Sequence, residues 1–234
     1  KSTVTGMVGW ILTDAGLDPT IMNGGVMKNF VADDAPFASA RVGKDGGGVF
    51  VSEVDESDGS IALFNPEVAV LNNVSLDHKS LDELRALFSD FARKAKHVVW
   101  NADDIETVAL MAPMALAGAV SFGFTDRADV RATDIIDLPL GSRFNLQAKG
   151  ESIAVNMQVP GRHNISNALA AVTAALAIGV SLAQAVHALE RFTGLARRFD
   201  IVGIAGGITV IDDFGHNPDK TAATLATLRA FPGR

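Results

Sequence analysis

The chain has 234 residues, of which 48% are hydrophobic and 20% charged, and its formal net charge is −7. This hydrophobic content can bury the core of one large domain, or of one domain and part of another, and it excludes a disordered chain. The negative charge disfavours non-specific nucleic-acid binding, because such binding needs a basic surface to neutralise phosphates. The absence of cysteine excludes disulfides and thiolate metal sites, and it fits a reducing cytoplasm.

The sequence shows no membrane segment and no signal peptide at its start. Its apolar stretch over residues 109–120 contains Pro113 and is too short to cross a bilayer, so we expect no membrane partner. The chain begins with Lys1 rather than an initiator methionine, and we therefore expect that the true N-terminus lies further upstream.

The first half of the chain alternates between helix-like and strand-like runs. This alternation predicts an α/β protein with a mostly parallel sheet and flanking helices. A possible capping box of Ser80 and Glu83 marks one helix start. The expected elements are a helix over residues 3–15 closed by Gly16, a buried strand over 48–53, a strand over 67–72, a helix over 80–96, and short strands over 97–100 and 119–122.

The second half changes character. Three strand-like runs suggest an antiparallel extension of the sheet, with a hairpin turn over 149–151. Two helices and a linker should follow, and then one strand and one helix, which are too little for a domain. The expected strands span 131–136, 143–148 and 152–159; helices start near Asn164 and after Ser181, Gly179 ends the first, the linker spans 194–200, and the last strand and helix span 207–212 and 219–231. We therefore predict one domain over 1–196 and the beginning of a Rossmann-like second domain over 197–234.

Lys1, Ser2 and Thr3 open the first predicted helix. In a phosphate-binding loop, a lysine reaches the β- and γ-phosphates and the next hydroxyl binds magnesium. The glycines that normally precede such a lysine are not in this sequence, and three residues alone equally describe an ordinary chain terminus.

Two predicted strands end in residues that could bind a metal. Glu53 begins the run Glu-Val-Asp-Glu-Ser-Asp, and Asp77-His78 follows the next strand. Ligands bind at the carboxyl ends of parallel strands, and carboxylates suit a hard cation. We expect the two strands to be adjacent, so that one site at the sheet edge would bring these residues together with Lys1. The alternatives are a solvated acidic loop and a structural histidine.

Residues 159–168 read Val-Pro-Gly-Arg-His-Asn-Ile-Ser-Asn-Ala. His163 and Asn167 are four residues apart, so they should share one face at the start of a helix. An asparagine amide can read a base edge because it offers both a donor and an acceptor. The alternative is that Asn164 caps the helix and Asn167 is solvated.

Charged residues also mark the linker and the strand that follows it. Arg198, in Arg-Arg-Phe-Asp, could bind a phosphate through its forked guanidinium. Asp213, in Asp-Asp-Phe-Gly-His-Asn-Pro, could bind a ribose hydroxyl. A surface arginine pair and an acidic turn explain these residues equally well on their own.

Taken in order, these motifs resemble the Mur ligase family, and the resemblance runs from Lys1 to about Pro218. Its pattern is Lys-Thr, Glu-x-Asp-Glu-Ser-Asp, Asn-x-x-x-Asp-His, Pro-Gly-x-His-Asn-x-x-Asn-Ala, Arg-Arg-Phe and Asp-Asp-x-x-His-x-Pro. The acidic motif is most similar to the branches that add L-alanine to UDP-N-acetylmuramate or recycle murein peptides. Ser2 stands for the usual Thr. Asn217 stands where alanine-adding members usually have His, and His-Asn-Pro at this place is more similar to the cyanophycin and folylpolyglutamate relatives.

The resemblance implies a role for each motif. Phosphates would be contacted by Lys1 and Arg198, and magnesium would be held by Ser2, Glu53 and His78. The rest of the nucleotide would be bound by Thr3, His163, Asn164, Asn167 and, at the ribose, Asp213. Of these residues, Lys1, Glu53, His78 and Arg198 would act in catalysis.

The implied protein is a cytoplasmic ligase that uses ATP and Mg²⁺ to join a UDP-muramyl carboxylate to an amino acid or peptide through an acyl phosphate, with no nucleic-acid partner. The first expectation is addition of L-alanine to UDP-N-acetylmuramate; the alternatives within the family are a murein-peptide recycling ligase and an amino-acid ligase of the cyanophycin or folylpolyglutamate type. We expect this piece alone to be inactive. Two alternatives from other classes stay open: a P-loop phosphohydrolase and a non-catalytic nucleotide-binding module.

Overall fold

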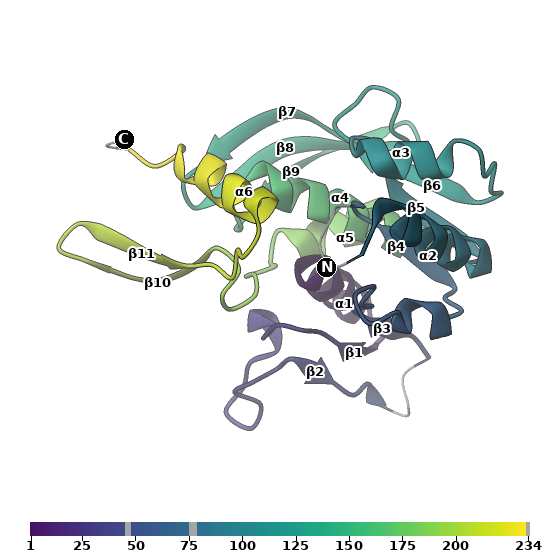
Figure 1. Cartoon of the computed structure of the whole chain (residues 1–234). Coiled ribbons are helices and arrows are strands. Elements are labelled where there is room, and N and C mark those ends of the chain that lie inside the picture. The colour runs from purple at the N-terminus through teal and green to yellow at the C-terminus, as the bar shows by residue number, and fades with distance from the viewer. Residues whose placement is uncertain (45–47, 75–78, 233–234) are drawn as a thin grey trace.

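The computed structural model describes residues 1–44, 48–74 and 79–232. Within these residues the largest unit is a six-stranded sheet with the order β4-β5-β6-β7-β8-β9 (Figure 1). Its strands are β4 (Val68–Leu71), β5 (His97–Asn101), β6 (Ala119–Gly123), β7 (Val130–Leu138), β8 (Gly141–Ala148) and β9 (Glu151–Met157). The first four are parallel, and β8 and β9 continue the sheet in antiparallel pairing. The predicted α/β class, mostly parallel sheet and antiparallel extension are confirmed.

Helices cover both faces of this sheet. On one face lie α4 (Arg162–Ala177) and α5 (Leu182–Leu189), and α1 (Ser2–Asp14) packs on both of them. On the other face lie α2 (Leu81–Lys94) and α3 (Ile105–Met111). Strand β4 shows why: Val68 and Val70 face the α1–α4–α5 core, whereas Ala69 and Leu71 face the α2–α3 core. This period of two places one parallel strand between two apolar layers.

The helix limits follow from capping chemistry. Ser80 and Glu83 form the expected capping box at α2, and Ser181 with Gln184 forms another at α5. Each box satisfies backbone N–H groups that the first helical turn leaves unpaired. Asn217 caps α6 (Pro218–Leu228) by accepting a hydrogen bond from the Lys220 N–H at 3.0 Å.

A separate three-stranded sheet with the order β2-β1-β3 lies against α1. It contains β1 (Thr20–Met22), β2 (Ala40–Arg41) and β3 (Phe50–Ser52), and β1 pairs in parallel with β3. Short 3₁₀ helices, Lys28–Phe30 and Ser60–Leu63, complete this region. Two expectations are wrong here. Strand β3 is not buried, since Phe50 is 58% exposed, and β3 and β4 are not neighbours, because they belong to different sheets.

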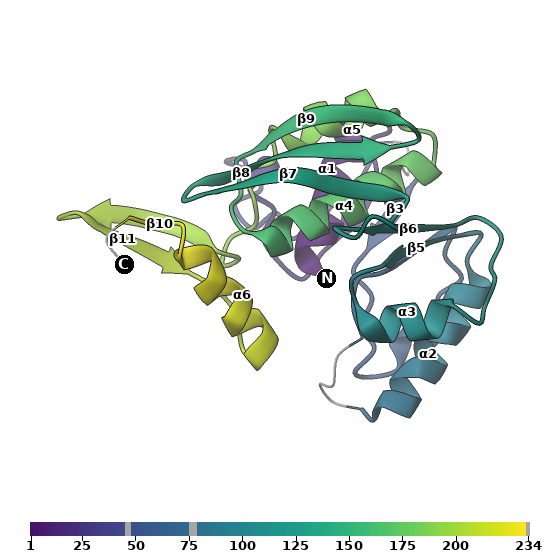
Figure 2. The same ribbon diagram turned by 90° about the horizontal axis from the view of Figure 1, so that it is seen from above.

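The end of the chain forms an antiparallel hairpin and a helix. The hairpin pairs β10 (Asp200–Ala205) with β11 (Ile208–Asp212), and it projects away from the rest of the chain in both views (Figures 1 and 2). Helix α6 returns toward the N-terminus of α4, where the two helices are in contact. The predicted single strand is therefore one half of a hairpin. Across the described segments, no helix is long and apolar enough to cross a membrane.

Candidate active site

Helix α1 begins at the mouth of a groove. Lys1 Nζ lies 2.9 Å from Glu56 Oε2 and 3.4 Å from Asp55 Oδ1, so the lysine is joined to the acidic run that follows β3. Partial burial lowers the pKa of Lys1, but the hydrogen bond and charge of Glu56, together with those of Asp55, outweigh it and leave the pKa raised. The lysine therefore carries a full positive charge at the start of a helix, where backbone N–H groups also favour an anion.

Glu53 is held beside this helix start by a turn that follows β1. Its backbone N–H donates to Met22 O at 3.0 Å, and its Oε2 accepts from the Gly24 N–H at 2.9 Å. The buried Asn23 donates through Nδ2 to Ser2 O at 3.1 Å. A Cβ on Gly24 would lie 2.9 Å from Glu53 Oε2, so a larger residue here would displace the carboxylate from its present position. The sequence analysis missed this turn, whose signal is Asn-Gly-Gly directly after an apolar strand.

Ser2 and Glu53 are suitable ligands for Mg²⁺. Both offer oxygen, and Mg²⁺ is typically held by one or two protein oxygens while waters and substrate phosphates complete its shell. The described part of the chain contains no cluster of three or more His, Asp or Glu residues that could bind a metal alone. A site with only two protein ligands, Ser2 and Glu53, is compatible with this finding. His78, the third predicted ligand, lies outside the described residues.

A series of asparagine amides connects α4 to β4. Asn164 donates to Pro160 O at 2.8 Å, Asn167 donates to Asn164 Oδ1 at 3.3 Å, and Asn72 donates to Asn167 Oδ1 at 3.2 Å. Each amide thereby orients the next one. Asn164 is not the helix cap, since α4 starts after Gly161, whose φ of +96° favours glycine. Asn72 was not predicted, and its buried Oδ1 has no hydrogen-bond partner among the residues that the structure describes.

His163 lies half-buried beside this amide series and beside α6. Its Nδ1 is 3.5 Å from Thr227 Oγ1, a contact between α4 and α6. Burial lowers the pKa of His163, and the negative charge of Asp213 opposes that shift only in part. The imidazole is therefore neutral near pH 7, which suits hydrogen bonding to a neutral base.

This shift predicts a pH effect on stability. Because the folded state binds the His163 proton less readily than the unfolded state, the free energy of unfolding should fall as the pH drops from about 6.5 toward the lower pKa of the folded protein. We expect urea unfolding at pH 7.5 and 5.5 to show a smaller decrease for His163→Gln than for the unchanged protein. His187→Gln, at an exposed site on α5, is the matched control. Equal decreases for His163→Gln and the unchanged protein would contradict the prediction.

Asp213 is less available to accept a hydrogen bond from a ribose hydroxyl than the sequence suggested, because both of its carboxylate oxygens already have backbone partners. Its Oδ2 accepts from the Phe199 N–H at 2.8 Å and its Oδ1 from the Gly215 N–H at 2.7 Å. The carboxylate thus connects the linker to the loop after β11. Lys220 Nζ lies 3.1 Å from His216 Nε2 on the same side of the groove, and neither residue was predicted.

One groove of about 1220 Å³ collects these residues. Every predicted site residue in the described ranges lines it: Lys1, Ser2, Thr3, Glu53, His163, Asn164, Asn167, Arg198 and Asp213. It lies at the carboxyl ends of β3, β4 and β5, and an apolar arm of it runs between β3 and β4. A groove with an apolar wall and a few converging polar groups is typical of a ligand site.

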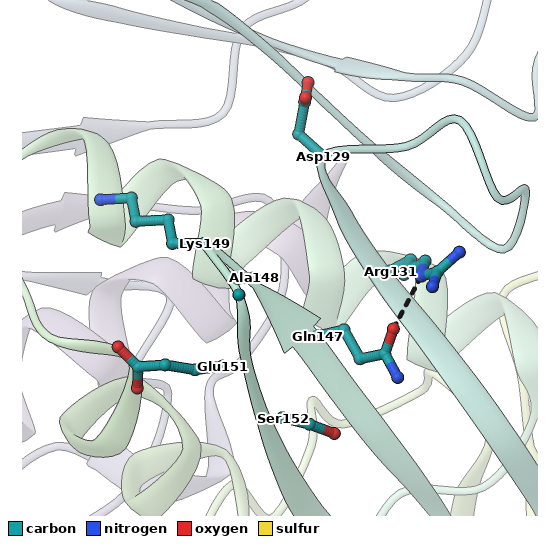
Figure 3. A pocket seen from close by; sticks show the side chains of 8 residues that line it. Asp129, Arg131, Gln147, Ala148, Lys149, Glu151 and Ser152 are labelled. Atoms are coloured by element: carbon teal, nitrogen blue, oxygen red, sulfur yellow. Dashed lines mark hydrogen bonds between the residues drawn. The ribbon is translucent and has the colours of Figure 1, made fainter.

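A second hollow, of about 370 Å³, lies at the β8–β9 turn (Figure 3). Arg131 there donates through Nε to Gln147 Oε1 at 2.8 Å, while the side chains of Lys149 and Glu151 both extend toward the left of the view, away from that pair. None of the predicted site residues lines this hollow.

The parallel sheet, the groove at the ends of its strands and the helix that starts in this groove define the ligand-binding α/β class. Residues 1–175 match the Mur ligase middle domain, and residues 197–234 match the Mur ligase glutamate ligase domain. The chain therefore belongs to the Mur ligase family.

Two sequence relatives are named UDP-N-acetylmuramate–L-alanine ligase. The one from Acidithiobacillus ferrooxidans is 36% identical over 98% of this chain and 50% of its own length, and the one from Lawsonia intracellularis is 37% identical over 100% and 51%. Among solved structures, the UDP-N-acetylmuramate–alanine ligase of Thermotoga maritima has a TM-score of 0.83 and 30% identity, over 98% of this chain and 52% of its own. A murein peptide ligase from Psychrobacter arcticus has a TM-score of 0.76 and 30% identity, over 97% and 52%. The chain spans about half the length of these relatives.

Proposed function

We propose that this chain is the ATP-binding core of an amide-forming ligase that adds L-alanine to UDP-N-acetylmuramate. The observation that carries the proposal is the convergence, in one groove, of two cationic side chains, two oxygen ligands and a set of oriented amides. The names of the alanine-adding relatives support the choice of substrates. The absence of cysteine fits a cytoplasmic location. We also propose a domain boundary between residues 196 and 197, which the separate family matches support.

The proposed reaction has two steps. An oxygen of the substrate carboxylate attacks the γ-phosphorus of ATP, and the bond from that phosphorus to the β,γ-bridging oxygen breaks, so that ADP leaves and an acyl phosphate forms. The neutral amine of the amino acid then attacks the acyl carbon. The carbon–oxygen bond to phosphate breaks, inorganic phosphate leaves, and the nitrogen releases a proton to solvent.

The chain's own residues contribute mainly charge and position. Lys1 and Arg198 would offset negative charge on the phosphate oxygens, since phosphoryl transfer is catalysed largely by electrostatic stabilisation. Ser2 and Glu53 would hold Mg²⁺, which would supply positive charge to offset the negative charge of the phosphate oxygens. Asn167, oriented by Asn164 and Asn72, would contact the adenine together with His163, and Asp213 would bind the ribose.

The test is phosphate release from ATP by the protein in its full encoded length. UDP-N-acetylmuramate is supplied with and without L-alanine, and the amide product is identified by mass. Release that requires both substrates, with one amide formed per phosphate, is the expected result. Release that requires a preformed peptide in place of L-alanine would support a murein-peptide ligase, the second candidate, which the Psychrobacter arcticus structure favours. Release without any acceptor would support a phosphohydrolase, and no turnover would leave a nucleotide-binding module.

A further inference from the structure

The linker between the two matched domains is fastened to the loop that follows β11. The Phe214 N–H donates to Arg197 O at 3.0 Å, and the Phe199 N–H donates to Asp213 Oδ2 at 2.8 Å. Arg197 and Phe199 have φ angles of +60° and +49°, a left-handed conformation that is costly for residues other than glycine. The linker therefore adopts a defined conformation that these contacts maintain.

The ring of Phe214 lies at the centre of this arrangement. The Cζ atom of Arg197 is 5.0 Å from the ring centroid, and that of Arg198 is 4.9 Å from it. Both distances are within the range of cation–π attraction. The ring is 46% exposed, and among the described residues it belongs to neither hydrophobic core. Core packing therefore does not explain a phenylalanine at this position.

The two arginines differ in what else they contact. Arg197 Nε lies 3.6 Å from Asp212 Oδ2, which partly neutralises it. Arg198 donates through Nη1 to Arg197 O at 3.2 Å, and within the ranges that the structure describes it has no carboxylate partner. Arg198 lines the groove, whereas Arg197 does not. The ring and one carbonyl thus hold Arg198 in place without cancelling its charge.

We propose that Phe214 is a positioning residue, whose ring holds the Arg198 guanidinium at the edge of the groove so that its charge faces the phosphates. This inference rests on the proposed function for its effect on turnover, but the ring contact itself can be tested without any activity. A held guanidinium loses less rotamer entropy when it meets a phosphate than a mobile one does.

The first experiment is an NMR measurement on the full-length protein with ¹³C-labelled arginine. A proton above an aromatic ring is shifted upfield, so the Hδ signals of Arg198, assigned by their loss in Arg198→Lys, should lie upfield. We expect that shift to disappear in Phe214→Leu and to remain in Phe214→Tyr. Arg198 signals at ordinary positions would overturn the proposal whether or not the protein is a ligase.

The second experiment is a double-mutant cycle on phosphate release at saturating substrates. Phe214→Leu should lower turnover about two- to fivefold, as expected for loss of an exposed cation–π contact, and Phe214→Tyr should restore most of it. In an Arg198→Met background, which lacks the cation, the same change should have little further effect. Phe37→Leu, at an 82% exposed phenylalanine, is the matched control and should leave turnover unchanged.

The outcomes of these two experiments distinguish a failure of the positioning role of Phe214 from a failure of the proposed function. Equal losses from Phe214→Leu in both backgrounds would show that the ring acts otherwise than through Arg198, and would overturn the proposal. If the upfield shift is present but Arg198→Met leaves turnover unchanged, the role of Arg198 in the proposed function is wrong, and the effect of Phe214 on turnover is overturned with it.

Discussion

Replacing Lys1 with methionine is expected to lower ATP-dependent phosphate release about 10²- to 10³-fold, the usual loss when one preorganised electrostatic contact is removed from an active site. The lysine stands at the start of α1, in the groove, with its pKa raised by Glu56 and Asp55. Methionine keeps a similar length and removes the charge. Initial rates of phosphate release at saturating substrates give the size of the effect.

Two controls make this result specific. Lys44→Met removes a positive charge that lies outside the groove, and it should leave the rate unchanged. Lys1→Arg keeps the charge but changes the shape of the cation, so it should recover only part of the activity. The ion pairs of Lys1 are partly exposed, and losing them should change the free energy of unfolding by at most about 1 kcal/mol. Full activity of Lys1→Met would refute the assignment of Lys1.

The second large effect concerns stability. Leu169 is fully buried at 0% exposure in α4, which contacts five strands of the main sheet and α1, α5 and α6. Replacing it with alanine should lower the free energy of unfolding by about 2–5 kcal/mol, through the lost burial and the cavity that remains. Urea unfolding, with the same dependence on denaturant in both proteins, measures the difference.

The matched control is Leu225→Ala on α6, where the side chain is 51% exposed. A surface truncation of this kind usually changes the free energy of unfolding by less than about 0.5 kcal/mol. If Leu169→Ala destabilised the protein no more than Leu225→Ala, the central place of α4 in the core would be contradicted.

The main architecture could be predicted because its elements carry local signals. Capping residues marked α2 and α5, and glycines with positive φ ended α1 and α4 at Gly16 and Gly179. The missed elements lack such signals. Strands β1 and β2 have only three and two residues, too few for a period to show, and α3 has seven. Strand β10 carries Gly203 within Asp200–Ala205, and no strand was expected between the linker that ends at residue 200 and the strand over 207–212.

The burial of β3 was mispredicted for a tertiary reason. An apolar run predicts a strand with two covered faces. Whether other elements cover those faces depends on tertiary packing, which the local sequence does not determine. Phe50 lies in a strand of the small sheet, beside the apolar arm of the groove, and it is half-exposed there.

The candidate site was predicted through the order of its motifs, and the structure brings their described residues into one groove. The roles of these residues in chemistry stay predictions. The contacts that orient them were not foreseen, because they join residues far apart in the chain. Asn72 reaches Asn167 across 95 residues, and the Gly24 N–H reaches Glu53 across 29. Such partners carry no motif and become visible only when the fold brings them together.

Helix α4 has a mechanical consequence, because it is both the centre of the core and the carrier of His163, Asn164 and Asn167 at one end. Its 16 residues give a rod about 24 Å long. A tilt of about 5° around its midpoint would move the first turn by about 1 Å. A displacement of about 1 Å in a reactive site can cost about 100-fold in rate. The close packing of the small alanines along this helix therefore limits its tilt, and with it the positional accuracy of His163, Asn164 and Asn167.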